Sequence, residues 1–451
     1  MTTKLKGGKV IASGGYGCIF NPALKCEDNN NETENKISKL MTIKHAKDEY
    51  NLIENFKELL KIIPNYQNYF LLDNFSLCKP AKLSKSDLLN YDVKCKALTK
   101  KNITSKNINK SLNEILSISM PDGGIDIEKY TKTDFTSSNI LKLNNSLINL
   151  LINGIVPMNK LNIFHCDIKD SNVLVETSEN MLTTRLIDWG LSINHKNKNG
   201  IPRKLYRRPF QYNVPFSSVM FNKIFLNKYY EFLELNPKID YFLIREFVTN
   251  YIFMWNDIRG PGHMNAINNI IKKLSINELT EIKSKTVKEH IIEYDFTYYY
   301  IIEYLSKILE KYTYDGKLEL ITYFNTVFLK NIDIWGFVMI YISMFEHFYE
   351  NFNELNEYQM QFINKIKYII IHILYENPNQ VIDINNLVEE LTNLNEIIKN
   401  LDINHVSKKL EYLTSLQSEN GGNIKTKKHK NNNKKRQNIK TKKRKNIKKI
   451  D

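Results

Sequence analysis

The sequence predicts an α+β fold in which a small β-rich lobe is followed by a larger helical lobe. Short segments of β type fill about the first 130 residues, whereas apolar residues at helical spacing dominate from about residue 136 onward. The chain has 451 residues, of which 42% are hydrophobic, and can therefore bury a sizeable core.

The first lobe is expected to contain five strands and one helix. The helix is predicted over Ile43–Ile63, where apolar side chains recur at Ala46, Ile53 and Leu60. The strands are expected at Lys9–Ser13, Cys18–Pro22, Lys36–Met41, Tyr69–Asn74 and Ile115–Met120.

The second lobe is expected to be mainly helical. Asn139–Leu161 has the apolar spacing of an amphipathic helix. Two short strands are expected at Asn172–Glu176 and Arg185–Asp188, and long helical stretches run from Asp333 to about Leu416.

The net charge of +15 is concentrated at the C-terminus. Residues 421–451 carry fourteen Lys and Arg against one Asp, a net +13, which leaves +2 for residues 1–420. The motif NIKTKKHK from Asn423 returns as NIKTKKRK from Asn438, without apolar periodicity. We therefore expect a disordered basic tail over 419–451. Its residues 421–451 would bind nucleic acid, serve as a nuclear address, or simply form a solvated extension.

Five cysteines stand at the irregularly spaced positions 18, 26, 78, 95 and 166. Such an odd, irregular set predicts neither disulfides nor a zinc site and favours a reducing compartment. The apolar runs are shorter than the roughly 18 residues of a membrane span, and the N-terminus lacks the apolar region of a secretory signal. The expected setting is intracellular, without a membrane partner.

A glycine-rich turn within Ile11–Phe20 joins the first two expected strands. Glycines there allow backbone N–H groups to approach phosphate oxygens, although a tight hairpin explains the same pattern. Lys39, between apolar neighbours on the third strand, needs a partner because an unpaired charge there would be costly. Glu49 on the following helix is the candidate and Glu54 the alternative. An exposed lysine and a solvated glutamate are the competing interpretation.

A short loop within Phe164–Val175 carries the residue types of a phosphoryl-transfer site. Asp167, Lys169 and Asn172 lie ahead of a strand, and Asp188 ends the next strand. Phosphoryl transfer needs a carboxylate that orients the nucleophilic hydroxyl, oxygen ligands for Mg²⁺, and a cation for the transferred phosphate. A polar turn between two strands does not explain this spacing.

These motifs resemble those of the eukaryotic-type protein kinase family. The pattern H-x-D-x-K-x-x-N is complete from His165 to Asn172, and Asp188-Trp-Gly190 resembles D-F-G. Asp333-Ile-Trp-Gly336 resembles the start of the helix that supports the catalytic loop. The segments GGKVIASGGYGCIFNPALKC and RRPFQYNVPFS further resemble Ser/Thr kinases of large DNA viruses.

The resemblance implies a bilobal protein-kinase-like fold with ATP and Mg²⁺ as cofactors. Its lobes would be residues 1–120 and 121–418, with a helical insertion at about 216–330. Asp167 would be the catalytic base and Lys169 would neutralise the γ-phosphate.

The resemblance also assigns the residues that hold Mg²⁺ and the nucleotide. Asn172 and Asp188 would bind Mg²⁺, while Lys39, paired with Glu49, would hold the α- and β-phosphates. The remaining nucleotide-binding residues belong to the glycine-rich loop and to the hinge between lobes. They are Ile11, Ala12, Ser13, Gly14, Gly15, Tyr16, Gly17, Cys18, Ile19, Ser119 and Met120.

Departures from the family pattern bear on regulation. Cys166 replaces the usual Arg before the catalytic Asp, so the cation that receives an activation-loop phosphate is missing. Cys166 is interpreted as a buried structural cysteine, with a redox sensor as the alternative. Ser192–Phe216 contains no Thr and no Ser after Ser192, so activity is expected to be independent of phosphorylation there. No arginine lies between Arg259 and Arg436, so the ion pair that ties this segment to a late helix is expected to be absent or replaced.

The expected function is an ATP- and Mg²⁺-dependent Ser/Thr protein kinase acting on a protein substrate. A small-molecule phosphotransferase of the aminoglycoside or choline type shares part of the loop pattern and is the first alternative. A nucleotide-binding pseudokinase with a nucleic-acid-docking tail is the second, because Ala12 and Trp189 replace a glycine and a phenylalanine. The viral resemblance implies the cytoplasm or nucleus of a host cell, or a virion.

Overall fold

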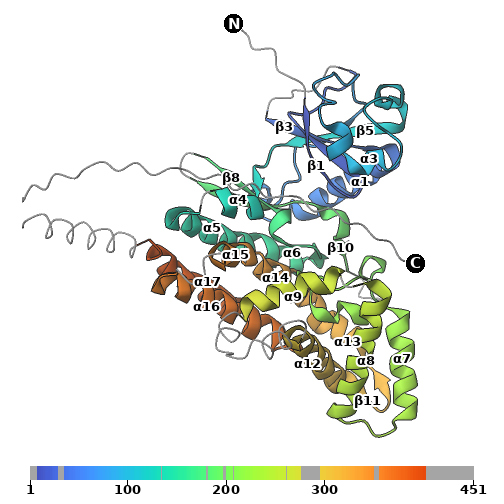
Figure 1. The fold of residues 1–451 in the computed structure, drawn as a ribbon, viewed down its shortest axis with the longest axis vertical. Helices are drawn as coiled ribbons and strands as arrows, with labels where there is room; N and C mark the ends of the chain where they lie inside the picture. The colour runs from blue at the N-terminus through green and yellow to red at the C-terminus, as the bar shows by residue number, and fades with distance from the viewer. Residues whose placement is uncertain are drawn as a thin grey trace, which may run out of the picture. The chain divides into compact units, whose positions relative to one another are not determined.

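The fold is mixed α+β, with antiparallel strands near the N-terminus and helices in most of the remainder (Figure 1). The computed structural model describes residues 8–28, 35–133, 135–178, 181–196, 200–206, 208–260, 262–275, 295–349 and 355–402. These residues belong to one compact unit, Met1–Asp402. The expected basic tail and the helical stretch toward Leu416 lie outside the described residues.

A five-stranded antiparallel sheet with the order β1-β2-β3-β5-β4 forms the N-terminal part. Helix α1, Ile43–Leu60, follows β3 directly, as the apolar spacing predicts. Four of the five expected strands are confirmed with small shifts at their ends. The strands are β1 Lys9–Ser13, β2 Gly17–Asn21, β3 Lys36–Thr42, β4 Ser76–Cys78 and β5 Ile115–Pro121.

The prediction of a strand at Tyr69–Asn74 was wrong. Leu71 N donates to Leu186 O at 3.1 Å, and Leu186 N donates to Tyr69 O at 2.8 Å. This segment therefore contacts the end of β9 and is not part of the five-stranded sheet. Phe70 and Leu72 are buried in the hydrophobic cluster of the helical part. The β-type composition therefore reflects burial, and the strand itself forms a few residues later as β4.

The helical part begins with α5, Ser137–Leu150, which continues through a π-helical turn, Leu151–Ile155, into α6, Val156–Lys160. This confirms the predicted helix at Asn139–Leu161. Short strands frame the expected loop: β7 Ile163–Phe164, β8 Val173–Thr177, β9 Leu182–Leu186 and β10 Ile193–Asn194.

The described parts of residues 216–330 are largely helical, as their Tyr and Phe content predicts. Aromatic rings pack between these helices, as in the edge-to-face pair of Phe225 and Tyr251 at 5.0 Å. The helices are α7 Lys223–Leu235, α8 Tyr241–Arg259, α9 Gly262–Leu274, α12 Asp295–Tyr312 and α13 Leu320–Tyr323.

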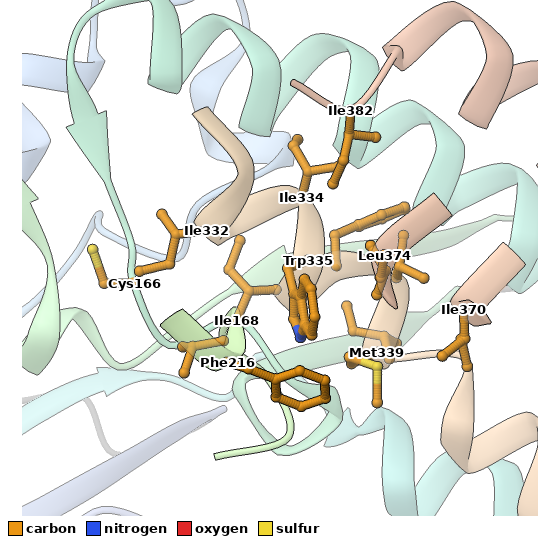
Figure 2. Close-up of a cluster of buried hydrophobic side chains, with 14 of the residues drawn as sticks. Cys166, Ile168, Phe216, Ile332, Ile334, Trp335, Met339, Ile370, Leu374 and Ile382 are labelled. Atoms are coloured by element: carbon orange, nitrogen blue, oxygen red, sulfur yellow. The ribbon is translucent and has the colours of Figure 1, made fainter. Parts of the chain in front are cut away.

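Helix α14, Leu329–Met339, runs through the core, and every side chain in it except Lys330 is buried. Figure 2 shows Trp335 and Met339 of this helix among Ile168, Phe216 and Ile370. Among the described residues, Leu320–Tyr349 is long and apolar enough to cross a membrane, but 94% of its apolar window is buried inside the fold. The helices that complete this part are α15 Ile342–Tyr349, α16 Glu357–Tyr368 and α17 Ile384–Lys399.

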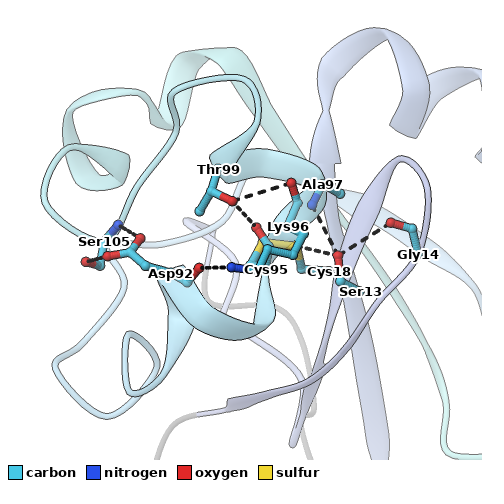
Figure 3. Close-up of a disulfide and its surroundings, with 9 residues drawn as sticks. All are labelled: Ser13, Gly14, Cys18, Asp92, Cys95, Lys96, Ala97, Thr99 and Ser105. Atoms are coloured by element: carbon cyan, nitrogen blue, oxygen red, sulfur yellow. Dashed lines mark hydrogen bonds between the residues drawn. A yellow bond between two sulfur atoms is a disulfide. The ribbon is translucent and has the colours of Figure 1, made fainter. Parts of the chain in front are cut away.

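Two disulfides correct the expectation of free thiols. Cys18 on β2 pairs with Cys95, with Cα atoms 5.3 Å apart (Figure 3). Cys26 pairs with Cys78, with Cα atoms 5.8 Å apart. The partners are 77 and 52 residues apart, so their pairing depends on tertiary packing that spacing does not reveal. The pairs favour an oxidising setting over the expected reducing compartment. Cys166 is free and buried, which raises the pKa of its thiol.

The two disulfides predict the thiol count of the protein. Chain purified and denatured without reductant should react with a thiol reagent at one site, Cys166, and after reduction at five. Loss of each bridge should lower the free energy of unfolding by about 2–4 kcal/mol, measured by urea titration with and without reductant. A Cys166→Ser chain should show no thiol before reduction. Five thiols in unreduced wild type would contradict the pairing.

Candidate active site

The loop between β7 and β8 is fixed by a single carboxylate from helix α14. His165 N donates to Asp333 Oδ2 at 2.8 Å, and Cys166 N donates to Asp333 Oδ1 at 2.7 Å. Cys166 has a φ of 62°, in the left-handed region that non-glycine residues rarely adopt. The two hydrogen bonds hold this conformation just before Asp167.

Asp333 is fully buried, and its environment sets two opposing effects on its pKa. Burial raises the pKa of Asp333 to about 7, while the backbone N–H groups of Cys166 and His165 and the nearby charge of Arg208 lower it. The carboxylate is thus bound by donors on the loop that it supports.

The Asp167 carboxylate is the point on which the loop side chains converge. Lys169 Nζ lies 3.1 Å from Asp167 Oδ2, and Asn172 Nδ2 donates to the same oxygen at 3.1 Å. Asn172 Nδ2 also donates to Asp167 O at 2.8 Å. Asn213 Nδ2 donates to Asp167 Oδ1 at 2.9 Å. The structure therefore brings the three predicted loop residues together around one carboxylate.

Arg208 is a site residue that the sequence analysis missed. Its side chain is 5% exposed, and Nη2 lies 3.5 Å from Asp167 Oδ1. It also donates to Cys166 O and, from Nη2 at 2.6 Å, to Gln211 Oε1. The guanidinium thus supplies a cation beside Cys166, where the sequence suggested that one was missing. Arg208 lies within the segment RRPFQYNVPFS, which contributed to the family resemblance, but nothing in a single sequence shows that this arginine is buried against the loop.

The predicted ion pair between β3 and α1 is present. Lys39 Nζ donates to both carboxylate oxygens of Glu49 at 2.7 Å. Both side chains are partly buried, with 18% and 26% exposure. Lys39 is therefore held toward α1, while Glu54, the alternative partner, makes no ion pair with the described residues.

The glycine-rich turn lies between β1 and β2. Gly14 N donates to Gly17 O at 2.9 Å, which closes the turn. A Cβ atom on Gly17 would lie 2.8 Å from Leu40 O, so the close approach of β3 requires glycine there. Tyr16 at the tip is exposed and packs on His45 of α1, with ring centroids 4.5 Å apart. Ile11, Ala12, Ser13 and Gly15 are also exposed, whereas Cys18 and Ile19 lie on β2.

The two predicted hinge residues differ in their accessibility. Ser119 is 1% exposed and pairs with Ser38 of β3 and Ser76 of β4, so it lies inside the sheet. Met120 is half-buried and extends past the register of β4. Both residues pair with β3, Met120 with Ile37, and this pairing continues to Pro121, so Met120 lacks a partner strand only on the β4 side.

Asp188 follows β9 in the left-handed conformation, with a φ of 64°, and its side chain is exposed. The preceding residue is tied to the loop, because Ile187 N donates to Asn172 O at 3.0 Å. The following residue, Trp189, is buried against Phe56 of α1 at 5.3 Å and against His165 at 5.0 Å. Trp189 therefore fills space between α1 and the loop.

Asn172 and Asp188 offer oxygen atoms that suit a divalent cation with few protein ligands. Asn172 uses its amide nitrogen on Asp167, which leaves the amide oxygen as a ligand atom. The Asp188 carboxylate accepts no hydrogen bond from the described residues. No group of three or more His, Cys, Asp or Glu suited to a metal occurs in the described part of the chain. Two oxygen ligands fit Mg²⁺ that is completed by water and phosphate.

The Asp167 cluster thus presents a carboxylate, the Lys169 ammonium and the Asn172 amide oxygen, whereas Lys39 on β3 and Asp188 after β9 form no hydrogen bond or ion pair with it among the described residues. Helix α1 contacts both regions, since its Glu49 holds Lys39 and its Phe56, about two turns further along, packs on Trp189. No protein-family model matches the chain, and no curated protein is found to be similar to it.

Gly336 provides a direct test of the packing beneath the loop. A Cβ atom on Gly336 would lie 2.5 Å from Ile168 O, whereas one on Gly262, also in a helix, would meet nothing within 4 Å. Gly336→Ala should therefore lower the free energy of unfolding by about 1–3 kcal/mol despite the better helix propensity of alanine. Gly262→Ala should leave stability unchanged or raise it. Equal urea midpoints for both variants would contradict the close packing.

Proposed function

We propose that this chain is an ATP- and Mg²⁺-dependent Ser/Thr protein kinase with a bilobal protein-kinase-like fold. The observation that carries the proposal is the convergence of Lys169 and Asn172 on Asp167 Oδ2, each at 3.1 Å. Phosphoryl transfer is mostly positioning and charge stabilisation, and this cluster supplies both on a rigid loop.

Each proposed role follows from the surroundings of the side chain. Asp167 accepts the proton of the substrate hydroxyl and orients its oxygen toward the phosphate. Lys169 is 27% exposed and can reach the transferred phosphate while remaining beside Asp167. Lys39 binds the α- and β-phosphates, and its contact with both carboxylate oxygens of Glu49 fixes the position of its ammonium group.

The residues present fit the proposed metal. Asn172 and Asp188 would hold Mg²⁺, which neutralises charge on the phosphates when it is bound. The glycine-rich turn offers backbone N–H groups to the phosphates, and Tyr16 at its tip packs on His45 of α1.

The contacts of the segment after Trp189 support activity without phosphorylation. Lys204 Nζ donates to Ser192 O at 2.9 Å, and Trp335 Nε1 donates to Tyr212 O at 2.9 Å. Arg208 and Asn213 bind the loop itself. The ordering that a phosphate on this segment would provide is therefore supplied by side chains already present.

Loss of the central carboxylates should abolish phosphate transfer. With labelled ATP and generic basic and acidic proteins as substrates, Asp167→Asn and Asp188→Ala should lower the rate by at least about 100-fold. Asp92→Asn, distant in sequence and bonded to Ser105, is the matched control and should retain activity. Transfer to an aminoglycoside or choline but to no protein would favour the small-molecule alternative. No transfer above the Asp188→Ala background would favour the pseudokinase.

Phosphatase treatment should leave the activity unchanged. Loss of activity after phosphatase treatment would contradict independence from phosphorylation.

Arg208→Gln should reduce activity strongly, because it leaves Cys166 O and Asp167 without a buried cation. Arg203→Gln, in the same segment but exposed, should behave as wild type. Circular dichroism would verify that the variants are folded. An active Arg208→Gln enzyme would contradict the proposed role of Arg208.

A further inference from the structure

A pocket of about 320 Å³ lies on the helical part, lined by α6, the start of α14, Val381, Ile382 and Ile384. It shares no lining residue with the Asp167 cluster. Figure 2 shows Ile334 and Ile382 of this wall as neighbours in the core. Its apolar wall is formed by Val156, Phe164, Leu329, Ile334, Ile382 and Ile384. Size and lining match sites that bind small ligands with an apolar body.

The charged side chains that line this pocket are both positive. Lys160 and Lys330 are exposed lining residues, and none of the described Asp or Glu residues lines the pocket. Neither ammonium forms an ion pair with a described residue. Asp383 lies between the lining residues Ile382 and Ile384, and its Oδ1 accepts hydrogen bonds from Asn385 N at 2.9 Å and Asn386 N at 3.2 Å. The two lysines are therefore available to an anion.

The neutral polar wall is satisfied internally. His195 N donates to Asn162 O at 2.8 Å, and His195 Nε2 lies 3.1 Å from Asn325 Oδ1. These groups shape the wall without adding a negative charge. An occupant is thus selected by apolar contact inside and by positive charge among the exposed lining residues.

We propose that this pocket binds a small amphipathic anion, an alkyl chain with one carboxylate head. The chain contacts the apolar wall, and the head lies near Lys160 and Lys330. Fully desolvated apolar area supplies most of the affinity, and the lysines determine the sign of the head group.

An occupant would also bear on the active-site loop. Phe164 and Ile334 line the pocket and are the sequence neighbours of His165 and Asp333, which are hydrogen-bonded to each other. Filling the pocket should therefore stiffen this contact and change the rate of phosphate transfer. This second step rests on the proposed kinase function, whereas binding does not.

Decanoate, below its micelle concentration, is the probe, and binding to the full chain is followed by calorimetry. Saturable binding is expected. The double variant Lys160→Glu/Lys330→Glu should weaken it by roughly tenfold or more, in a salt-dependent way. The double variant Lys142→Glu/Lys228→Glu, at exposed lysines of α5 and α7 outside the pocket, is the charge-matched control and should bind as wild type. Val156→Trp should block binding with both lysines intact.

Absence of saturable decanoate binding would overturn the site. The site would also be overturned if decyltrimethylammonium bound as tightly as decanoate. The same holds if decanoate binding were unchanged in both the Lys160→Glu/Lys330→Glu and the Val156→Trp variants. Phosphate transfer is then measured with and without saturating decanoate. Unchanged transfer despite binding overturns only the coupling to the loop. A chain that binds decanoate but transfers no phosphate contradicts the proposed kinase, while the binding site stands.

Discussion

The buried carboxylate of Asp333 is the constraint on which the candidate site depends. It accepts consecutive backbone N–H groups from His165 and Cys166 at 2.8 and 2.7 Å, in the interior where neither group could find water. Burial of the acid raises its pKa to about 7, and the same two donors oppose that rise. The Asp333 carboxylate and the two backbone N–H groups therefore stabilise each other, because removing either partner would leave buried polar groups without hydrogen bonds. The backbone conformation set in this way determines where Asp167 points.

Helix α14 extends this constraint to the segment on the other side of Asp167. Trp335 Nε1 donates to Tyr212 O at 2.9 Å, and Gly336 packs directly under Ile168 O. One helix thus fixes both the loop and residues 208–213, whose Arg208 and Asn213 reach Asp167 Oδ1. Because α14 is buried almost throughout, its position is determined by core packing and not by contacts within the site. Core and catalytic geometry are therefore coupled.

The sequence predicted the parts of this arrangement that depend on local pattern. Lys39 and Glu49 are ten residues apart on a strand and the helix that follows it, so their pairing needs no long-range information. Asp167, Lys169 and Asn172 lie in one short loop for the same reason. Arg208 could not be predicted, because it reaches Cys166 and Asp167 from a separate turn that packing brings back. The cysteine pairs were missed likewise, since an odd and irregular set gives no pairing. At Tyr69–Asn74 the β-type composition was real, but its cause was burial against β9.

The disulfides also limit how the glycine-rich turn can move. Cys18 fixes the β2 end of the turn to Cys95, and at the β1 end Ser13 Oγ accepts a hydrogen bond from Ala97 N at 3.2 Å. Movement of the whole hairpin would break one of these ties, so freedom is confined to Gly14–Gly17. A Cβ atom on Gly15 would meet nothing within 4 Å, so no packing demands glycine there. What glycine provides at the tip is backbone freedom and close approach. On the proposed function, the turn therefore covers a phosphate by a local change at its tip, on a hairpin that the disulfide holds in place directly beside the turn.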